Sequence, residues 1–327
     1  METLFSKFKD IKVAVVGDVM LDTYWWGNVE RISPEAPVPV VSMNSKEYRI
    51  GGAGNVALNL AALGAQTSIF SVIGTDEDGN TLKQLLEVNN INTTHIVTTE
   101  KRITTSKTRV ICRNQQLMRI DNEITEDLDS GMEQSLFNAI EQYIINEKPA
   151  ILIFEDYNKG ILTEGLITKV IDLCKHHQVI TTVDPKKKNF FSYKGVDIFK
   201  PNLKEVKEGL NIILEDVSLN SMNHVHQLLY KALNHQISFI TLSEHGVFYH
   251  SPDTSDIIPS HIRNIADVSG AGDTVIAVTS LVYATTKDIQ LASAMGNIAG
   301  GLVCEEVGTA AINKEKLLQE CKQLLGQ

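Results

Sequence analysis

The sequence predicts an α/β fold in which a mostly parallel central sheet is covered by helices on both faces. Short β-rich runs alternate with stretches of helical periodicity, an order typical of parallel strands joined by right-handed crossovers. No internal repeat, low-complexity tract or flexible linker divides the 327 residues. We therefore expect a single domain over residues 1–327, from which a small β-sheet projects as a lid.

The composition is that of an ordinary globular enzyme, with 43% hydrophobic residues and a formal net charge of −10. This charge argues against a nucleic-acid surface, which needs a broad basic face. The first apolar run is short and ends at Gly17 and Asp18, so we expect neither a signal peptide nor a membrane span, and a cytoplasmic location. The four cysteines form no CxxC pair, which argues against a disulfide framework or a structural zinc site.

Six runs are the candidate strands of the central sheet. They are KVAVVG (12–17), TSIFSVIG (67–74), AILIFED (150–156), VITTVDP (179–185), DIFKPN (197–202) and FITLSE (239–244). Polar residues lie at or just past their carboxyl ends, namely Asp18, Asp156, Asp184, Asn202 and Ser243. Open α/β sheets place their ligand crevice at this edge, so the sequence predicts a binding site there.

Two segments depart from this rhythm and predict the lid, with strands from about 22–50 and 92–121. In RISPEAPVPVV (31–41) three prolines favour an exposed edge or an extended arm. In TTSKTRVICRNQQLMRID (104–121) period-two alternation places Lys107, Arg109 and Arg113 on one strand face. Apolar side chains on this lid, including Trp25 and Trp26, predict a homodimer formed through the lid strands.

The segment DVSGAGDTVIAVTS (267–280) predicts an anion site at the start of an apolar helix. The backbone amides of Gly270, Ala271, Gly272 and Asp273 have no partner in a helical first turn, and the helix dipole favours negative charge there. Asp273 adds a candidate base. The alternative is a glycine-rich turn into a buried helix, with Asp273 only a first-turn carboxylate. A second segment, GGAGNVALNLAALG (51–64), also opens an apolar helix and carries Asn55 in its first turn.

In this order and separation, the two glycine-rich segments resemble the signatures of the ribokinase-like (PfkB) sugar kinases, and the resemblance covers essentially the whole chain. PNLKE (201–205) is similar to the family's Asn-x-x-Glu motif, and TLSEHG (241–246) to its phosphate loop, although Ser243 stands where glycine is usual. The resemblance implies a ribokinase-like three-layer sandwich with a small β-lid, ATP and Mg²⁺ as cofactors, Asp273 as general base and the GAGD helix start as anion hole.

The same resemblance assigns the nucleotide and ion ligands. Asn202 and Glu205 would orient the waters of Mg²⁺ and the phosphates, and the alternative is that they form a helix capping box. The other nucleotide-binding candidates are Thr241, Ser243, Gly246, Asn297 and Gly308. Asp267, with the backbone near Ser269 and Gly308, resembles the family's monovalent-cation site, for which K⁺ is the candidate ion.

More specific segments resemble the heptose 7-phosphate kinases of the ADP-heptose pathway within this family. They are GDVMLDTYWWG (17–27), RISPEAPVPVV (31–41), RNQQLMRID (113–121), DYNKG (156–160) and DPKKKNF (184–190). The implied reaction phosphorylates O1 of D-glycero-D-manno-heptose 7-phosphate for lipopolysaccharide core synthesis. The resemblance is to the kinase half of an enzyme, and in many bacteria this kinase is fused to a nucleotidyltransferase. We expect that this chain does not contain the nucleotidyltransferase. Glu155 and the run from Lys187 to Asn189 depart from that pattern.

Sugar ligands are expected from three places. Asp18 and Asp22 follow the first strand, Asp156 follows a later one, and Gly51, Gly52 and Asn55 approach the ring. The phosphate of the sugar needs cations in a chain of net negative charge, and the candidates are Lys107, Arg109, Arg113 and Lys186, together with Arg49. The alternatives are that Asp18 only caps a turn and that the strand charges only protect an exposed edge.

Other functions are weighed on the same residues. Neither glycine-rich segment gives GxGxxG after the first strand, which argues against a nicotinamide dehydrogenase. A sugar sensor without catalysis is disfavoured by Asp273 within GAGD, and another PfkB kinase acting on a different free or phosphorylated sugar is the main alternative. His176, His177, His224 and His226 are expected to be solvated.

Overall fold

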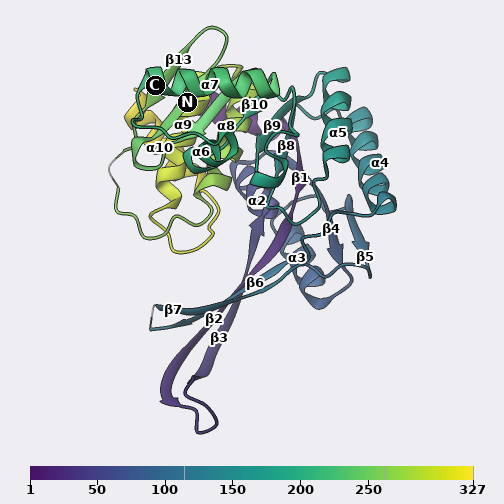
Figure 1. Cartoon of the computed structure of the whole chain (residues 1–327), viewed down its shortest axis with the longest axis vertical. Coiled ribbons are helices and arrows are strands. Elements are labelled where there is room, and N and C mark those ends of the chain that lie inside the picture. Colours follow the sequence, from purple (N-terminus) through teal and green to yellow (C-terminus); the bar gives the residue numbers. More distant parts are fainter. Residues whose placement is uncertain (114, 262, 327) are drawn as a thin grey trace.

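The computed structural model describes residues 1–113, 115–261 and 263–326. Its larger sheet has the strand order β13-β12-β11-β10-β9-β8-β1-β4-β5, with parallel pairing from β11 to β5 and antiparallel pairing at β12 and β13 (Figure 1). All six predicted runs are strands of this sheet. Its strands are β1 (Lys12–Gly17), β4 (Gln66–Gly74), β5 (Ile96–Thr99), β8 (Ile151–Glu155), β9 (Ile180–Asp184), β10 (Ile198–Phe199), β11 (Ile237–Thr241), β12 (Val247–His250) and β13 (Ser255–Ile258).

Helices cover both faces of the sheet, because alternate side chains of the buried parallel strands feed two separate apolar cores. One core contains residues of α1 (Glu2–Lys7), α2 (Ala53–Leu63), α3 (Glu77–Val88), α8 (Ala271–Thr286), α9 (Ile289–Val303) and α10 (Lys314–Leu325). The other contains residues of α4 (Ser130–Glu147), α5 (Glu164–His176), α6 (Leu203–Leu210) and α7 (Leu219–Leu233). This arrangement confirms the predicted three-layer sandwich.

A second sheet of order β3-β2-β6-β7 forms the lid and extends away from the body of the molecule (Figure 1). Its strands are β2 (Val19–Ile32), β3 (Pro39–Gly52), β6 (Ser106–Cys112) and β7 (Gln115–Asn122). Pro39 begins β3, which lies at the edge of the sheet as the prolines predicted. The lid is smaller than expected near residue 92, because β5 adds to the edge of the larger sheet.

Two predictions about single residues need correction. Arg113 does not share the strand face of Lys107 and Arg109, because β6 ends at Cys112 and Arg113 is exposed in the following turn with φ of 49°. His226 is buried where α7 packs on the sheet, and its Nδ1 lies 2.9 Å from Oγ of Ser238. The other three of those histidines are exposed, as predicted.

The four cysteines are free thiols, as predicted. Within the described ranges, none of the helices combines the length and the apolar character that a membrane crossing requires.

Candidate active site

The two glycine-rich segments meet where α2 and α8 begin. Gly52 (φ 59°) precedes α2 and Gly270 (φ 78°) precedes α8, and in both cases glycine permits a left-handed turn directly before the helix. The side chain of Asn55, in the first turn of α2, donates from Nδ2 to Oδ2 of Asp273 at 2.7 Å. Segments more than two hundred residues apart thus form one site.

Asp273 is a buried carboxylate that is held by two side chains. Besides Asn55, the hydroxyl of Tyr157 donates to its Oδ1 at 2.6 Å. Burial raises the pKa of Asp273 to about 6, although these two hydrogen bonds act in the opposite direction. At neutral pH the group is therefore mostly ionised and can accept a proton.

Three of the four predicted amides at the start of α8 remain available. Within the described residues, the amides of Gly270, Gly272 and Asp273 make no hydrogen bond, whereas that of Ala271 donates to the carbonyl of Val268 at 3.3 Å. A side chain carbon placed on Gly272 would approach Oδ2 of Asp184 at 3.7 Å and Nζ of Lys200 at 3.9 Å, and no described atom more closely. A side chain carbon at Gly272 would thus meet these two groups in ordinary van der Waals contact, and the start of α8 lies next to the charged residues at the carboxyl edge of the sheet.

Beneath the start of α8, charged side chains converge from three neighbouring strands. Asp184 ends β9, and its Oδ2 lies 2.7 Å from Nζ of the buried Lys200, which follows β10. Lys186 lies 3.0 Å from Oδ1 of Asp184 and 2.7 Å from Oε1 of Glu205. Although burial opposes it, this pair of lysines holds the pKa of Asp184 below its ordinary value. Lys186 thus pairs with Asp184 and Glu205. It does not lie with the cations of the lid, with which we grouped it.

Glu155 ends β8 next to Asp184 and is completely buried. Neither of its carboxylate oxygens has a hydrogen-bond partner within the described residues. Burial, and then the neighbouring carboxylates of Asp184 and Asp273, raise its pKa well above the ordinary value. Its surroundings therefore favour the protonated form of Glu155 over the ionised form.

Asn202 and Glu205 form the capping box that was the alternative prediction. The Glu205 amide donates to Oδ1 of Asn202 at 2.9 Å, and the Asn202 amide donates to Oε2 of Glu205 at 2.8 Å. The remaining oxygen of Glu205 points to Lys186. The cap does not exclude an ion-binding role, because a carboxylate on a helix start can also hold the water of a bound cation.

The other predicted nucleotide ligands follow β11 or lie on α9 and in the loop after it. Thr241 ends β11, and Ser243 follows with φ of 54°, a left-handed conformation that glycine adopts with less strain than serine. Gly246 also has positive φ, of 91°. Asn297 on α9 donates from Nδ2 to the carbonyl of Pro259 at 2.8 Å, so part of its side chain serves the protein itself.

Asp267 joins the two segments that were predicted to hold a monovalent cation. Its Oδ1 accepts from the amide and the hydroxyl of Ser269, at 3.0 and 2.8 Å, and its Oδ2 accepts from the amide of Gly308 at 2.9 Å. Although burial opposes them, these bonds lower the pKa of Asp267 below its ordinary value.

At the root of the lid, Asp22 is buried and its Oδ1 pairs with Nη1 of Arg109 at 2.5 Å. Gly51 lies opposite, and a side chain there would collide with the Asp22 carboxylate. Lys107, on the same face of β6 as Arg109, lies 3.5 Å from carboxylate oxygens of both Asp121 and Glu123. Lys159 pairs with Glu123 at 2.7 Å. A row of cations, each balanced by a carboxylate, therefore borders Asp22.

Asp18 and Asp156 hold the loop after β8 rather than face open space. The fully buried carboxylate of Asp18 accepts from the amides of Tyr157, Lys159 and Ile161 at 2.8, 3.1 and 3.2 Å. The buried carboxylate of Asp156 accepts from the Asn158 amide and from the side chains of Asn189 and Tyr193. In this structure both carboxylates thus have protein partners, and their predicted direct contact with the sugar stays a prediction.

Tyr157, Lys159 and Lys200 belong to the site but were not singled out as candidates from the sequence. Each had a local signal, because Tyr157 directly follows the carboxyl end of a predicted strand, Lys159 lies in DYNKG, and Lys200 lies within DIFKPN.

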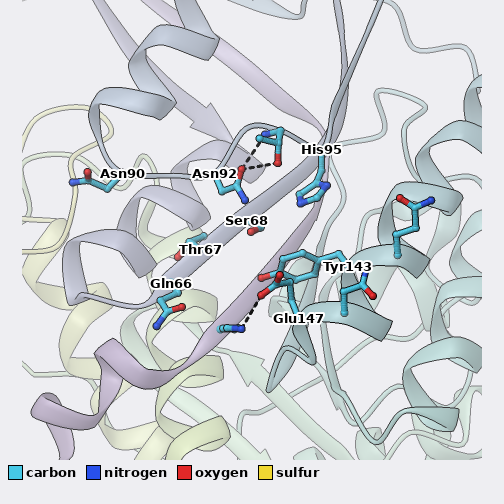
Figure 2. Close-up of a pocket in the computed structure, with 12 residues that line it drawn as sticks. Gln66, Thr67, Ser68, Asn90, Asn92, His95, Tyr143 and Glu147 are labelled. Atoms are coloured by element: carbon cyan, nitrogen blue, oxygen red, sulfur yellow. Dashed lines mark hydrogen bonds and ion pairs between the residues drawn. The ribbon is translucent and has the colours of Figure 1, made fainter.

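A hollow of about 570 Å³ lies elsewhere, at the amino ends of β1 and β4 beside α4 (Figure 2). Carboxamide, hydroxyl and aromatic side chains line it, and its one ion pair joins Lys12 to Glu147 at 2.7 Å. None of the predicted site residues is among the residues that line it.

Comparison with known proteins identifies the family of this chain. The family model described as pfkB family carbohydrate kinase matches residues 10–316. The chain is 35% identical over 319 residues to the bifunctional protein HldE of Geobacter metallireducens, covering 97% of this chain and 64% of that protein. It is 38% identical over 302 residues to the bifunctional protein HldE of Sulfurimonas denitrificans, covering 92% of this chain and 62% of the relative. The chain thus spans less than two thirds of the length of these relatives.

Solved structures share the fold. Phosphofructokinase-2 from Escherichia coli superposes with a TM-score of 0.79 at 17% identity, over 97% of this chain and all of that one. Ribokinase from Arabidopsis thaliana, in complex with ribose and ATP, gives a TM-score of 0.74 at 15% identity, over 94% of this chain and 99% of that one. With the family match over nearly its whole length, this chain belongs to the pfkB family of carbohydrate kinases.

Proposed function

We propose that this kinase transfers the γ-phosphoryl group of ATP to O1 of D-glycero-D-manno-heptose 7-phosphate, a step of lipopolysaccharide core synthesis. The observation that carries the chemistry is Asp273, a carboxylate with a pKa of about 6 beside the unbonded amides of Gly272 and of its own residue. The choice of sugar rests on the segments that resemble heptose 7-phosphate kinases and on the lid cations.

In the proposed reaction, Asp273 accepts the proton of the O1 hydroxyl as that oxygen forms a bond to the γ-phosphorus. The bond from this phosphorus to the β,γ-bridging oxygen breaks, and ADP leaves with the electron pair. The amides of Gly270, Gly272 and Asp273 donate to the oxygens of the phosphoryl group, on which charge accumulates. Ala271 contributes less than we expected, because its amide already has an acceptor.

The residues beneath α8 fit a Mg²⁺–nucleotide complex. Within the described ranges, no group of three or more His, Cys, Asp or Glu side chains is placed to enclose a metal ion. Mg²⁺ bound with a nucleotide requires only one or two carboxylates, since waters and phosphates complete its octahedron. Glu205 is the proposed holder of these waters, with Asp184 next to it, and the bound ion would neutralise phosphate charge. Asn202, Thr241, Ser243, Gly246, Asn297 and Gly308 remain the proposed nucleotide contacts.

We assign the 7-phosphate to the lid cations Lys107 and Arg109, to which the geometry adds Lys159. A dianion would replace the carboxylate partners at 3.5 Å from Lys107 with a charge-assisted bond. Asp22, Gly51, Gly52 and Asn55 are proposed to position the sugar ring. Arg113 lies in the β6–β7 turn, and a role in binding the phosphate is not proposed for it.

The lid also supports the proposed homodimer, and Asp267 the proposed K⁺ site. Several large apolar side chains of the lid are exposed, namely Ile32, Val38, Met43, Leu117, Met118 and Ile120. A mass of one chain by light scattering at micromolar concentration would contradict the dimer. Activity that does not respond to replacing K⁺ with a large organic cation would contradict the ion site.

The test of the function is ATP turnover against free and phosphorylated heptoses, hexoses and pentoses. We expect the highest kcat/KM for D-glycero-D-manno-heptose 7-phosphate and a product phosphorylated at O1, identified by NMR. Asp273→Asn is expected to lose nearly all turnover while it still binds ATP in calorimetry. Preference for another sugar would identify a different carbohydrate kinase, and near-normal turnover of Asp273→Asn would refute the base.

A further inference from the structure

Arg49 connects the lid to the loop that follows α9. It lies on β3, and its Nη1 donates to the carbonyls of Val307 and Thr309 at 2.8 and 3.3 Å. Its Nε donates to Oε1 of Glu47 at 2.6 Å. Arg49 was a candidate ligand of the substrate phosphate, and in this structure its Nε and Nη1 bind groups of the protein.

The same guanidinium packs on an aromatic ring at the root of the lid. Its Cζ lies 4.7 Å from the ring centroid of Tyr24 on β2, and Cζ of Arg109 lies 5.2 Å from that centroid. Gly308 completes the contact, because a side chain there would collide with Arg49 and would lie 3.0 Å from the Tyr24 hydroxyl. The lid residues that border Asp22 and the 307–309 loop therefore pack as one unit.

This unit continues to the anion hole. The Gly308 amide donates to Asp267, and the other Asp267 oxygen accepts from Ser269, which directly precedes Gly270. Every step from Arg49 to Gly270 is a hydrogen bond or a peptide bond. A displacement of the lid root is thus passed to the helix start on which the phosphoryl group is proposed to bind.

We propose that Arg49 is a positioning residue that couples the lid to the nucleotide side of the site. A nucleotide that binds against the loop after α9 then favours one placement of the lid. The inference rests on the proposed function for the location of the nucleotide. Coupling of this kind is reciprocal in binding free energy, so the lid placement in turn favours nucleotide. Lysine cannot replace Arg49, because a single ammonium cannot bind Glu47 through one nitrogen and the two carbonyls through another while a planar group packs on the ring of Tyr24.

The lid carries its own reporter. The chain has two tryptophans, Trp25 and Trp26, and both lie on β2. The indole of Trp26 donates to Oε2 of Glu47, the carboxylate that pairs with Arg49, at 3.3 Å. Tryptophan emission therefore reports on this network. Both tryptophans lie on the lid, and the printed contact of Trp26 is with Glu47 and not with the loop after α9.

The experiment titrates the full chain with Mg²⁺ and the non-hydrolysable analogue AMP-PNP, without sugar, and follows tryptophan emission while calorimetry measures nucleotide binding. We expect an emission change in the wild type and loss of most of it in Arg49→Met and Arg49→Lys, both of which still bind AMP-PNP. The matched control is Arg31→Met, a change of an exposed arginine at the far end of β2, which should keep the full emission change.

Three results would overturn the proposal. The first is that the wild type binds AMP-PNP without an emission change, and the second is that Arg49→Met keeps the change. The third is that both folded Arg49 variants lose AMP-PNP binding, which would make Arg49 a direct ligand of the nucleotide. Circular dichroism checks folding, and if Arg49→Met is unfolded, Arg49→Lys decides. Because no sugar is used, failure of the heptose assignment appears only in the substrate panel and leaves this test unaffected.

Discussion

The hydroxyl of Tyr157, from the loop after β8, lies 2.6 Å from Oδ1 of Asp273 in the first turn of α8. This bond stabilises the ionised form of the carboxylate, while burial raises its pKa to about 6. Tyr157→Phe removes the donor, so the pKa of Asp273 should rise. We expect the acidic limb of the kcat/KM–pH profile to move from near pH 6 to higher pH by about 1 unit.

The matched control for this shift is Tyr193→Phe, which removes a similar buried bond, at 2.8 Å to Asp156. Its acidic limb should stay in place. A Tyr157→Phe profile that superimposes on the wild-type profile would show that the acidic limb does not report on Asp273.

Gly272 tests the anion hole without disturbing the fold. Apart from the neighbouring residues and the backbone of its own helix, the nearest described atom to an added methyl group would be Oδ2 of Asp184, at 3.7 Å. Gly272→Ala should therefore unfold at the wild-type temperature or slightly above it. The methyl group would occupy the space proposed for the phosphoryl group. We expect kcat to fall by about 100-fold or more.

Gly131→Ala, in the first turn of α4, is the comparison for Gly272→Ala, because it adds the same methyl group at a helix start remote from the site. It should leave kcat unchanged. Equal kcat in both variants would mean that phosphoryl transfer does not take place in front of Gly272.

Arg109 is expected to bind the phosphate of the sugar in addition to pairing with Asp22. Arg109→Met should raise KM for a phosphorylated sugar by about tenfold or more, because a charge-assisted bond to a dianion is lost, and should leave KM for ATP nearly unchanged. Arg119→Met is the matched lid variant, since Arg119 is exposed and pairs only with Asp121 among the described acids. Equal increases of KM for both substrates would contradict the assignment.

Glu155 predicts how stability changes with pH. The pKa of Glu155 in the folded protein lies well above its ordinary value of about 4.5. Between these two pKa values the native state keeps a proton that the unfolded chain has released. Stability contributed by this group is therefore lost as pH rises, with a limiting slope of about 1.4 kcal/mol per pH unit. Glu155→Gln removes the titration, so its Tm should match the wild type near pH 4.5 and exceed it increasingly as pH rises above that value. Parallel Tm–pH curves would show that Glu155 does not hold this proton.

The strands and the helix starts were predictable because their signals are local. Apolar runs of strand length identify a buried parallel sheet, and Gly52 and Gly270 mark turns that other residues adopt only with strain. Glycine was expected at position 243, and the backbone of Ser243 is indeed in the left-handed conformation that glycine adopts most easily.

The partners of individual charges could not be predicted, because they depend on which strands become neighbours. Lys186 was grouped with the lid cations, but it pairs with Asp184, two residues before it, and with Glu205 on α6, which the pairing of β10 with β9 brings close. Period-two alternation through Arg113 failed because nothing in the alternation itself marks the turn at which β6 ends. Tyr157 was missed for the same reason, since its partner Asp273 is more than a hundred residues away.

A single residue, Asp18, separates the last residue of β1 from the first residue of β2. Its amide donates to Glu155, its carbonyl accepts from Ala53, and its carboxylate accepts three amides of the 157–161 segment. The root of the lid is therefore tied to the segment that carries Tyr157. A shift of β2 at this residue would have to displace the Tyr157 amide, so the lid root and the proposed proton acceptor share one anchor.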